Sequence, residues 1–91
     1  MTDGDVATET LDDDDLMSRA REDDGRAYRL LFDRYWPRVT SLCALYMPTW
    51  DAAEECAQDA FVRLWQSRAS YEPKGSFKPY LFRIARNVCY R

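Results

Sequence analysis

The chain has 91 residues, a formal net charge of −3, 46% hydrophobic residues and 32% charged residues. This length predicts one small domain with a thin core, and the many Trp, Tyr and Phe residues favour a packed core over disorder. No apolar run approaches the length of a membrane span and no signal peptide is present, so we expect a cytoplasmic protein without membrane insertion.

The charges are distributed unevenly along the chain. Residues 1–24 hold ten acids and two bases, a balance of −8, whereas residues 61–91 hold seven bases and one acid, a balance of +6. Charge per segment decides what each segment attracts, so the C-terminal third favours a nucleic-acid partner despite the acidic total.

The residue types argue against catalysis and metal binding. There is no His, no Gly-rich phosphate loop and no Ser paired with a base, so we expect neither an enzyme nor a cofactor. Cys43, Cys56 and Cys89 are irregularly spaced and fit no zinc pattern. We expect reduced thiols that are buried or half-buried, because free Cys usually behaves as a small hydrophobic residue.

The N-terminal segment divides into a leader and a short helix. Residues 1–11 are acidic and lack apolar periodicity, so we expect a disordered leader before a domain at 12–91. The run from Asp12 to Asp15 favours a helix start that carries Leu16, Met17 and Ala20, with an end near 24–25. We interpret the Asp run as solvated; an internal mimic of DNA is the alternative.

The second predicted helix runs from Arg26 to Met47 and is ended by Pro48. Pro37 lies inside it and removes a backbone hydrogen bond, so we expect one kinked helix, with two helices meeting at Trp36-Pro37 as the alternative. Its apolar positions recur at helical spacing: Ala27, Leu31, Tyr35, Val39, Leu42, Cys43 and Tyr46.

The third predicted helix begins at Asp51, where Glu54 completes a capping-box pattern, and fades over 67–70. Its apolar stripe comprises Ala53, Ala57, Ala60, Phe61, Leu64 and Trp65. Another face, at i, i+3, i+4 and i+7 spacing, presents Glu55, Gln58, Asp59 and Val62. This face suits an Arg-rich helical partner, and a solvated outer surface is the alternative.

The last predicted elements are a loop over 71–75 and a helix that Ser76 caps, with Pro79 in its first turn. The inward stripe is Phe77, Tyr80, Leu81, Ile84, Ala85 and Val88. No strand is predicted, so the fold class is all-α: three main helices plus a short N-terminal helix. The chain stops at Arg91 without a helix-stop signal, which favours an excised piece of a longer protein.

Residues 71–91 combine basic and aromatic residues around a single acid, Glu72. Cations attract phosphate and flat rings stack on unpaired bases, so this stretch suits a single DNA strand. Two roles stay open: Tyr80 faces the core by spacing but could stack on a base, and Arg83 could form an internal ion pair or contact phosphate. Lys74, Lys78, Arg86 and Arg91 are the remaining phosphate candidates.

Residues from Ala27 to Arg91 resemble region 2 of bacterial extracytoplasmic-function (ECF) sigma factors. Three blocks carry the resemblance in the right order: RYWPRV at 34–39, AAEECAQDAFVRLW at 52–65 and SFKPYLFRIARN at 76–87. The family implies that the helix over 51–65 docks on the clamp helices of the largest RNA polymerase subunit. It also implies that the loop and last helix melt the −10 promoter element and hold the non-template strand with one flipped base.

The resemblance assigns roles residue by residue. Polymerase binding falls to Glu55, Gln58, Asp59 and Val62. DNA binding falls to Tyr71, Lys74, Gly75, Ser76, Phe77, Lys78, Tyr80, Arg83, Arg86 and Asn87. The partners implied are the RNA polymerase core, promoter DNA and an anti-sigma factor.

The chain departs from the family pattern in four respects, one of which is Cys56, where an aliphatic residue is usual. Its loop reads EPKG where a Gly-rich loop is usual, so the selected base does not carry over, and Pro79-Tyr80 replaces a common Thr-Trp pair. The second, helix-turn-helix domain (region 4), which reads the −35 element, is absent from these 91 residues. The alternative function is a helical interaction module, an adaptor or anti-sigma-binding domain, without DNA binding.

Overall fold

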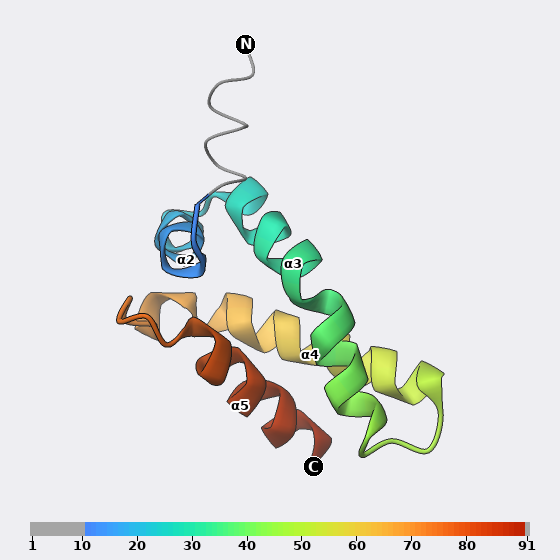
Figure 1. The fold of residues 1–91 in the computed structure, drawn as a ribbon. Helices are drawn as coiled ribbons and strands as arrows, with labels where there is room; N and C mark the ends of the chain where they lie inside the picture. Colours follow the sequence, from blue (N-terminus) through green and yellow to red (C-terminus); the bar gives the residue numbers. More distant parts are fainter. Residues whose placement is uncertain (1–10, 91) are drawn as a thin grey trace.

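The computed structural model describes residues 11–90, which form four α-helices and one short 3-10 helix (Figure 1). In chain order these are α2 (Asp13–Arg21), α3 (Gly25–Ala44), α4 (Trp50–Gln66), η1 (Arg68–Ser70) and α5 (Phe77–Cys89). The described part holds no strand, which confirms the all-α prediction. The predicted disorder of residues 1–10 and the predicted role of Arg91 lie outside the described residues.

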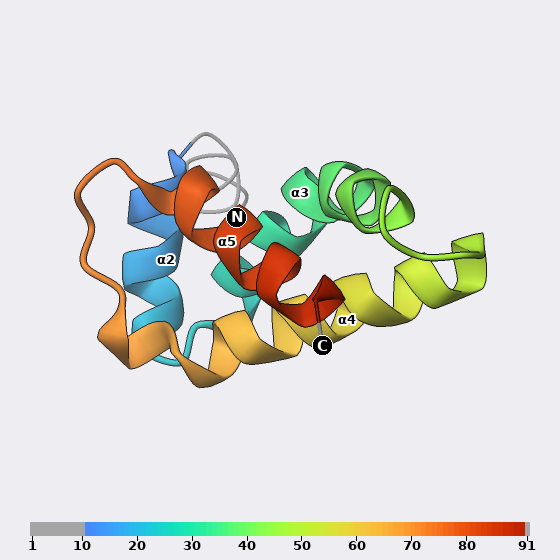
Figure 2. The same ribbon diagram turned by 90° about the horizontal axis from the view of Figure 1, so that it is seen from below.

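The core lies where the four helices meet. The long α3 contacts α2, α4 and α5, and α4 also packs along α5 (Figures 1 and 2). Each helix contributes large, fully buried side chains: Leu16 and Met17, Leu31 and Val39, Leu64, and Phe77 and Leu81. The predicted inward face of the short N-terminal helix is confirmed, because Leu16, Met17 and Ala20 are all buried.

Helix α3 runs unbroken through Pro37, so the alternative of two helices is wrong. It begins at Gly25 and is capped by Asp24, whose side chain accepts hydrogen bonds from the amides of Arg26 and Ala27. It ends at Ala44, three residues before the predicted end at Met47. Beyond Ala44 the chain turns into the α3–α4 connection.

Helix α4 begins earlier than predicted, at Trp50, and its N-cap is Thr49 instead of Asp51. The Thr49 hydroxyl accepts a hydrogen bond from the Ala52 amide at 3.1 Å. Glu54 does not close a capping box, since its carboxylate accepts a hydrogen bond from the Trp50 indole at 3.2 Å. Both Thr and Asp are good caps, and two candidates two residues apart compete for one position.

Helix α5 begins at Phe77 with Ser76 at the N-cap, as predicted, but the Ser76 side chain makes no capping hydrogen bond. Gly75 precedes it with a φ of 74°, a left-handed conformation that glycine adopts without strain. Of the predicted inward stripe, Phe77, Leu81, Ala85 and Val88 are buried and the other two residues are half-buried. The helix ends at Cys89, with Tyr90 as its C-cap residue.

The cysteines occur as expected: Cys43 and Cys89 are buried, Cys56 is half-buried and all three are free thiols. Burial, followed by contact with the Cys89 thiol, raises the pKa of Cys43 to about 12. Such a thiol stays protonated at neutral pH and is a poor nucleophile. Within residues 11–90, no helix has the length and apolar character needed to span a membrane.

Candidate DNA pocket and partner groove

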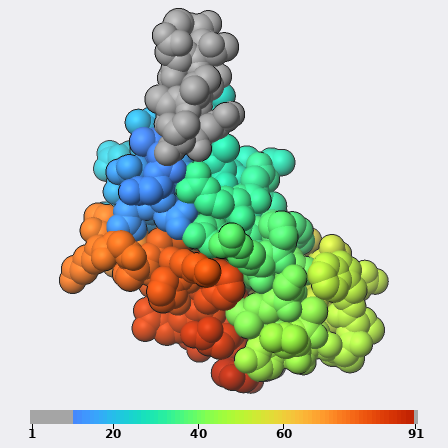
Figure 3. Space-filling model, in the orientation of Figure 1, coloured from blue at the N-terminus to red at the C-terminus, as the bar shows by residue number. Residues whose placement is uncertain are grey.

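The loop that joins η1 to α5 is held from behind by the N-terminal helix. Both oxygens of the Asp14 carboxylate accept hydrogen bonds from it: one from the Tyr71 hydroxyl and one from the Gly75 amide. At the other end of α2, the Arg21 guanidinium donates to the Tyr71 carbonyl at 3.1 Å. Figures 2 and 3 show α2 lying against this loop and the start of α5.

A surface pocket of about 430 Å³ opens between this loop and α5. Its lining is polar and basic and comprises Ser70, Tyr71, Glu72, Lys74, Ser76, Pro79, Tyr80, Arg83 and Arg86. The volume lies within the range of sites that enclose small organic groups. The helical spacing of α5 places Pro79, Arg83 and Arg86 along one side of the pocket.

Aromatic rings form the floor of this pocket. The ring of Tyr71 is only 3% exposed and lies 5.0 Å from Tyr80 and 5.8 Å from Phe77, between ring centres. The half-buried Tyr80 shares a hydrogen bond of 2.8 Å with the Ser67 hydroxyl. Burial, and then the hydrogen bond to Asp14, raise the pKa of Tyr71 to about 12, so its hydroxyl remains a proton donor. The lining of the pocket therefore includes two packed aromatic rings, of the buried Tyr71 and the half-buried Tyr80.

Two arginines give the pocket its positive charge. Among the residues that the structure describes, no carboxylate lies within ion-pair distance of Arg83 or Arg86, so the internal ion pair considered for Arg83 is absent there. Lys74 differs from expectation, because it pairs with Glu72 at 2.7 Å. Both partners of that pair are about 70% exposed, and such pairs contribute little stability.

The structure brings together half of the predicted DNA-contacting residues on an accessible surface. Lys74, Ser76, Tyr80, Arg83 and Arg86 line the pocket. Asn87 is exposed one helical turn beyond Arg83, outside the lining. Lys78 lies on another side of α5, where it stands over the Phe82 ring at 5.9 Å. Gly75 lies at the back of the loop, in a recess beside the Asp run.

Burial limits the role that two of the predicted DNA contacts can have in this structure. The rings of Tyr71 and Phe77 are 3% and 2% exposed, so they support the loop and do not present a stacking face. The aromatic pattern of the sequence indicated both residues, but pattern alone does not separate a ring that packs beneath a loop from one that faces a ligand.

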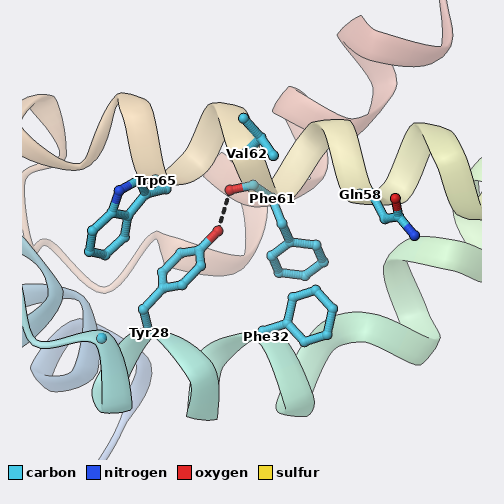
Figure 4. Close-up of a pocket in the computed structure, with 7 residues that line it drawn as sticks. Tyr28, Phe32, Gln58, Phe61, Val62 and Trp65 are labelled. Carbon is cyan, nitrogen blue, oxygen red and sulfur yellow. Dashed lines mark hydrogen bonds between the residues drawn. The ribbon is translucent and has the colours of Figure 1, made fainter.

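A second hollow of about 560 Å³ lies between α3 and α4, and its lining is mainly aromatic (Figure 4). We call it the α3–α4 groove; it is lined by Gly25, Tyr28, Phe32, Gln58, Phe61, Val62 and Trp65. The Tyr28 hydroxyl donates a hydrogen bond to the Phe61 carbonyl, and burial raises the Tyr28 pKa. Ring pairs 4.8 Å and 4.9 Å apart, Phe32 with Phe61 and Tyr28 with Trp65, build its walls.

The predicted partner face of α4 borders this groove. Gln58 and Val62 line it, and Val62 is 52% exposed although it is aliphatic. Glu55 is exposed, and Asp59 forms an ion pair at 3.3 Å with Arg63 one turn later. The face therefore combines an apolar hollow with acidic and amide side chains beside it.

Sequence reasoning missed Asp14 and the aromatic walls of the groove. Asp14 lies three residues before the buried Met17, so helical spacing could have indicated that it approaches the core. Tyr28 and Phe32 are likewise four residues apart on α3 and define a second apolar side. No group of His, Cys, Asp and Glu in the described part of the chain is arranged to hold a metal ion.

Comparison with known proteins identifies the class. The family model for Sigma-70 region 2 matches residues 31–91, so the chain belongs to the sigma-70 region 2 family. Its relatives include the ECF RNA polymerase sigma-E factors of Escherichia coli (strain K12) and Haemophilus influenzae, 34% and 32% identical over 89% and 88% of this chain. The chain covers 42% of each of those proteins.

A solved structure gives the same result in three dimensions. An NMR structure of an engineered region 2 of sigmaE in complex with GTAAAA has a TM-score of 0.82 with this chain. The two are 32% identical, and the match covers 88% of this chain and 83% of that one. The resemblance to ECF sigma region 2 is thereby confirmed. Sigma factors are initiation factors and not enzymes, which agrees with the non-enzymatic role expected from the sequence.

Proposed function

We propose that this domain binds the non-template strand of a −10 promoter element as single-stranded DNA. In this proposal one flipped base enters the pocket between the loop and α5, which we call the DNA pocket. The observation that carries it is that pocket: an aromatic floor beside two arginines that lack acidic partners among the described residues. The similarity to a region 2 that was solved with GTAAAA supports the same assignment.

The chemistry of the pocket suits a base with its flanking phosphates. The half-buried ring of Tyr80 lines the pocket and offers a surface for a base, and base–aromatic stacking contributes about 1–3 kcal/mol per base. Arg83, Arg86 and Lys74 provide cations for phosphate, whereas Ser76 can donate and accept hydrogen bonds at a base edge. Asn87, one turn farther along α5, is assigned to the nucleotide next to the flipped base.

Binding to single-stranded oligonucleotides tests this proposal. We expect the chain to bind GTAAAA more tightly than the same sequence in a duplex, with affinity falling as salt rises. Arg83→Ala should weaken binding by about 1.5–3 kcal/mol, tenfold or more in Kd, because it removes a charged hydrogen bond. Fluorescence anisotropy at several salt concentrations measures both quantities.

The matched control is Arg29→Ala. Arg29 is an exposed arginine on α3 that pairs with Asp33 and lies outside the pocket. The Arg29→Ala variant loses the same charge as Arg83→Ala, but its affinity for DNA should change by less. Equal losses for the two variants, or equal binding of single strand and duplex, would contradict the proposed site.

We further propose that the α4 face and the α3–α4 groove dock on the clamp helices of the RNA polymerase core. Arg-rich helices meet acids and amides through charge-assisted hydrogen bonds, and the groove accepts an apolar side chain. Glu55, Gln58 and Asp59 would supply the polar contacts, with Val62 at the groove edge.

An anti-sigma factor that covered either surface would block the domain. We place the protein in the cytoplasm, where the polymerase acts.

A double variant tests the docking proposal. Asp59→Arg with Gln58→Ala should cost several kcal/mol of affinity for a clamp-helix fragment, since a charge reversal in a paired interface is strongly unfavourable. The control is Glu72→Arg, which also reverses a charge in an exposed ion pair but lies in the DNA pocket. If isothermal titration gave the double variant an unchanged affinity, the docking assignment would be wrong.

A further inference from the structure

We propose that Asp14 is a positioning residue for base selection: its carboxylate fixes the shape of the loop at residues 71–76 from the side away from the DNA pocket. This inference rests on the proposed function, because it assigns to Asp14 the geometry of the loop that is to accept the base. It assigns no DNA contact to Asp14 itself.

The first observation is that Asp14 joins the two ends of the loop. One carboxylate oxygen accepts from the Tyr71 hydroxyl and the other from the Gly75 amide. Tyr71 is buried at the start of the loop, whereas Gly75 is exposed at its end and has a left-handed φ of 74°. A single side chain therefore fixes the distance between the buried start and the turn that leads into α5.

The second observation is that the loop has few other ties, which are the hydrogen bonds of Ser76 and Arg21 to Tyr71. Within residues 11–90, residues 72–75 make no backbone–backbone hydrogen bond outside the helices, and residues 72–76 are all exposed. The ion pair between Glu72 and Lys74 joins two exposed side chains of the loop to each other and does not tie the loop to a helix. An exposed loop with so few ties would adopt many conformations without the Asp14 bridge.

The third observation is the side on which Asp14 lies. It is absent from the lining of the DNA pocket and lines a recess with Gly75, Phe77 and Lys78 on the other side of the loop. Both of its oxygens are already engaged by the loop. These positions favour a support behind the loop over an acidic group that competes with DNA for the pocket.

The neighbouring Asp13 provides a matched control. It lies in the same first turn of α2 and also bonds a tyrosine hydroxyl, but that tyrosine is Tyr35 of α3, and its second partner is Arg34 at 2.9 Å. Asp13→Ala and Asp14→Ala therefore remove the same charge, and each removes a carboxylate that accepts one hydrogen bond at each oxygen. Only Asp14→Ala frees the loop.

The experiment measures base selectivity with the whole 91-residue chain. Binding to GTAAAA and to its single-base variants gives, for each protein, the ratio of Kd values between the preferred base and the next. Asp14→Ala should lower that ratio by about two- to tenfold, the range that one or two hydrogen bonds provide. Asp13→Ala should leave the ratio unchanged, although both variants gain the same general affinity for DNA from the lost negative charge.

Asp14→Asn separates positioning from charge. Its amide oxygen can accept from Gly75 while its NH2 group donates to the Tyr71 oxygen, so the bridge survives without the charge. We expect wild-type selectivity from this variant. Amide hydrogen exchange supplies a readout without DNA: Gly75 should exchange faster in Asp14→Ala and at the wild-type rate in Asp13→Ala.

The outcomes distinguish this inference from the function on which it rests. A wild-type chain that discriminates bases, together with an Asp14→Ala variant that discriminates equally, would overturn the inference alone. Loss of selectivity in Asp13→Ala to the same extent would also overturn it. A wild-type chain that prefers no base would overturn the proposed function and this inference together. If Asp14→Ala does not fold, Tyr71→Phe removes one of the two bonds and should lower the ratio less.

Discussion

Thr49 and Ser76 occupy the same N-cap position of their helices, but only Thr49 caps with its side chain. The Thr49 hydroxyl accepts from the Ala52 amide, whereas Ser76, with a φ of −118° and a ψ of 27°, makes no such bond. Ser76 instead lines the pocket between the loop and α5 and hydrogen-bonds the Tyr71 hydroxyl. At the residue scale, Ser76 therefore makes no capping hydrogen bond to α5 and is instead available to a ligand in the pocket.

This difference predicts unequal effects of alanine. Thr49→Ala should cost about 1 kcal/mol of unfolding free energy, a typical value for a lost helix cap. Ser76→Ala should cost only a few tenths of a kcal/mol, typical of an exposed site without a special role, but should reduce DNA affinity. Urea denaturation of both variants compares them directly, and equal losses of stability would show that Ser76 caps α5 in solution.

Helical spacing predicted correctly most of the helix side chains that are buried. It did not predict roles that depend on contacts between residues far apart in sequence. The inward stripe of α4 was predicted from apolar spacing, and all of its residues except the half-buried Trp65 are fully buried. Tyr71 was predicted as a DNA contact from the family resemblance and from the aromatic and basic pattern of residues 71–91. Its hydrogen bond to Asp14 spans 57 positions of sequence, and no local pattern contains that information.

At the scale of elements, α2 and the residues just after it hold α3, η1 and the loop at residues 71–76 together through side-chain hydrogen bonds. Asp13 and Asp14 bond the hydroxyls of Tyr35 and Tyr71, and Arg68 of η1 donates to Asp23 just beyond the end of α2 at 2.6 Å. The sequence predicted this helix and its buried face, but the interpretation of its Asp run as solvated is wrong for these two acids, which are partly buried.

The raised pKa values of Tyr35 and Tyr71 predict that the packing of α2 against the rest of the domain becomes less stable at alkaline pH. Burial first, and then the hydrogen bonds to the aspartates, raise the pKa of Tyr35 and of Tyr71 to about 12 from an ordinary value of 10.0. A proton held more tightly in the folded state stabilises the fold below the ordinary pKa. That stability is lost as pH rises from about 10 to about 12.

Thermal unfolding as a function of pH tests this prediction. The melting temperature should fall steeply between pH 10 and pH 12, with each tyrosine contributing at most about 1.4 kcal/mol per pH unit. A chain with both Tyr35→Phe and Tyr71→Phe should start less stable and show a shallower fall. Parallel curves for the two proteins would mean that other groups cause the alkaline loss.

At the scale of the whole molecule, two hollows with opposite chemistry share no lining residue. The pocket beside α5 is polar and basic, and the α3–α4 groove is aromatic, with acidic side chains on the neighbouring face of α4. The charge imbalance of the sequence indicated the first surface. The second was indicated only in part, because its walls come from two helices whose packing no single stretch of sequence specifies. Under the proposed function, separate surfaces would allow the domain to hold polymerase and DNA at the same time.

The central claim is that single-stranded DNA enters the pocket between the loop and α5, and amide chemical-shift mapping tests it most directly. On titration of the 91-residue chain with GTAAAA, we expect the largest shifts at Lys74, Ser76, Arg83 and Arg86, and small shifts along the α3–α4 groove. Largest shifts along the groove, or shifts spread evenly over all basic residues, would contradict the account.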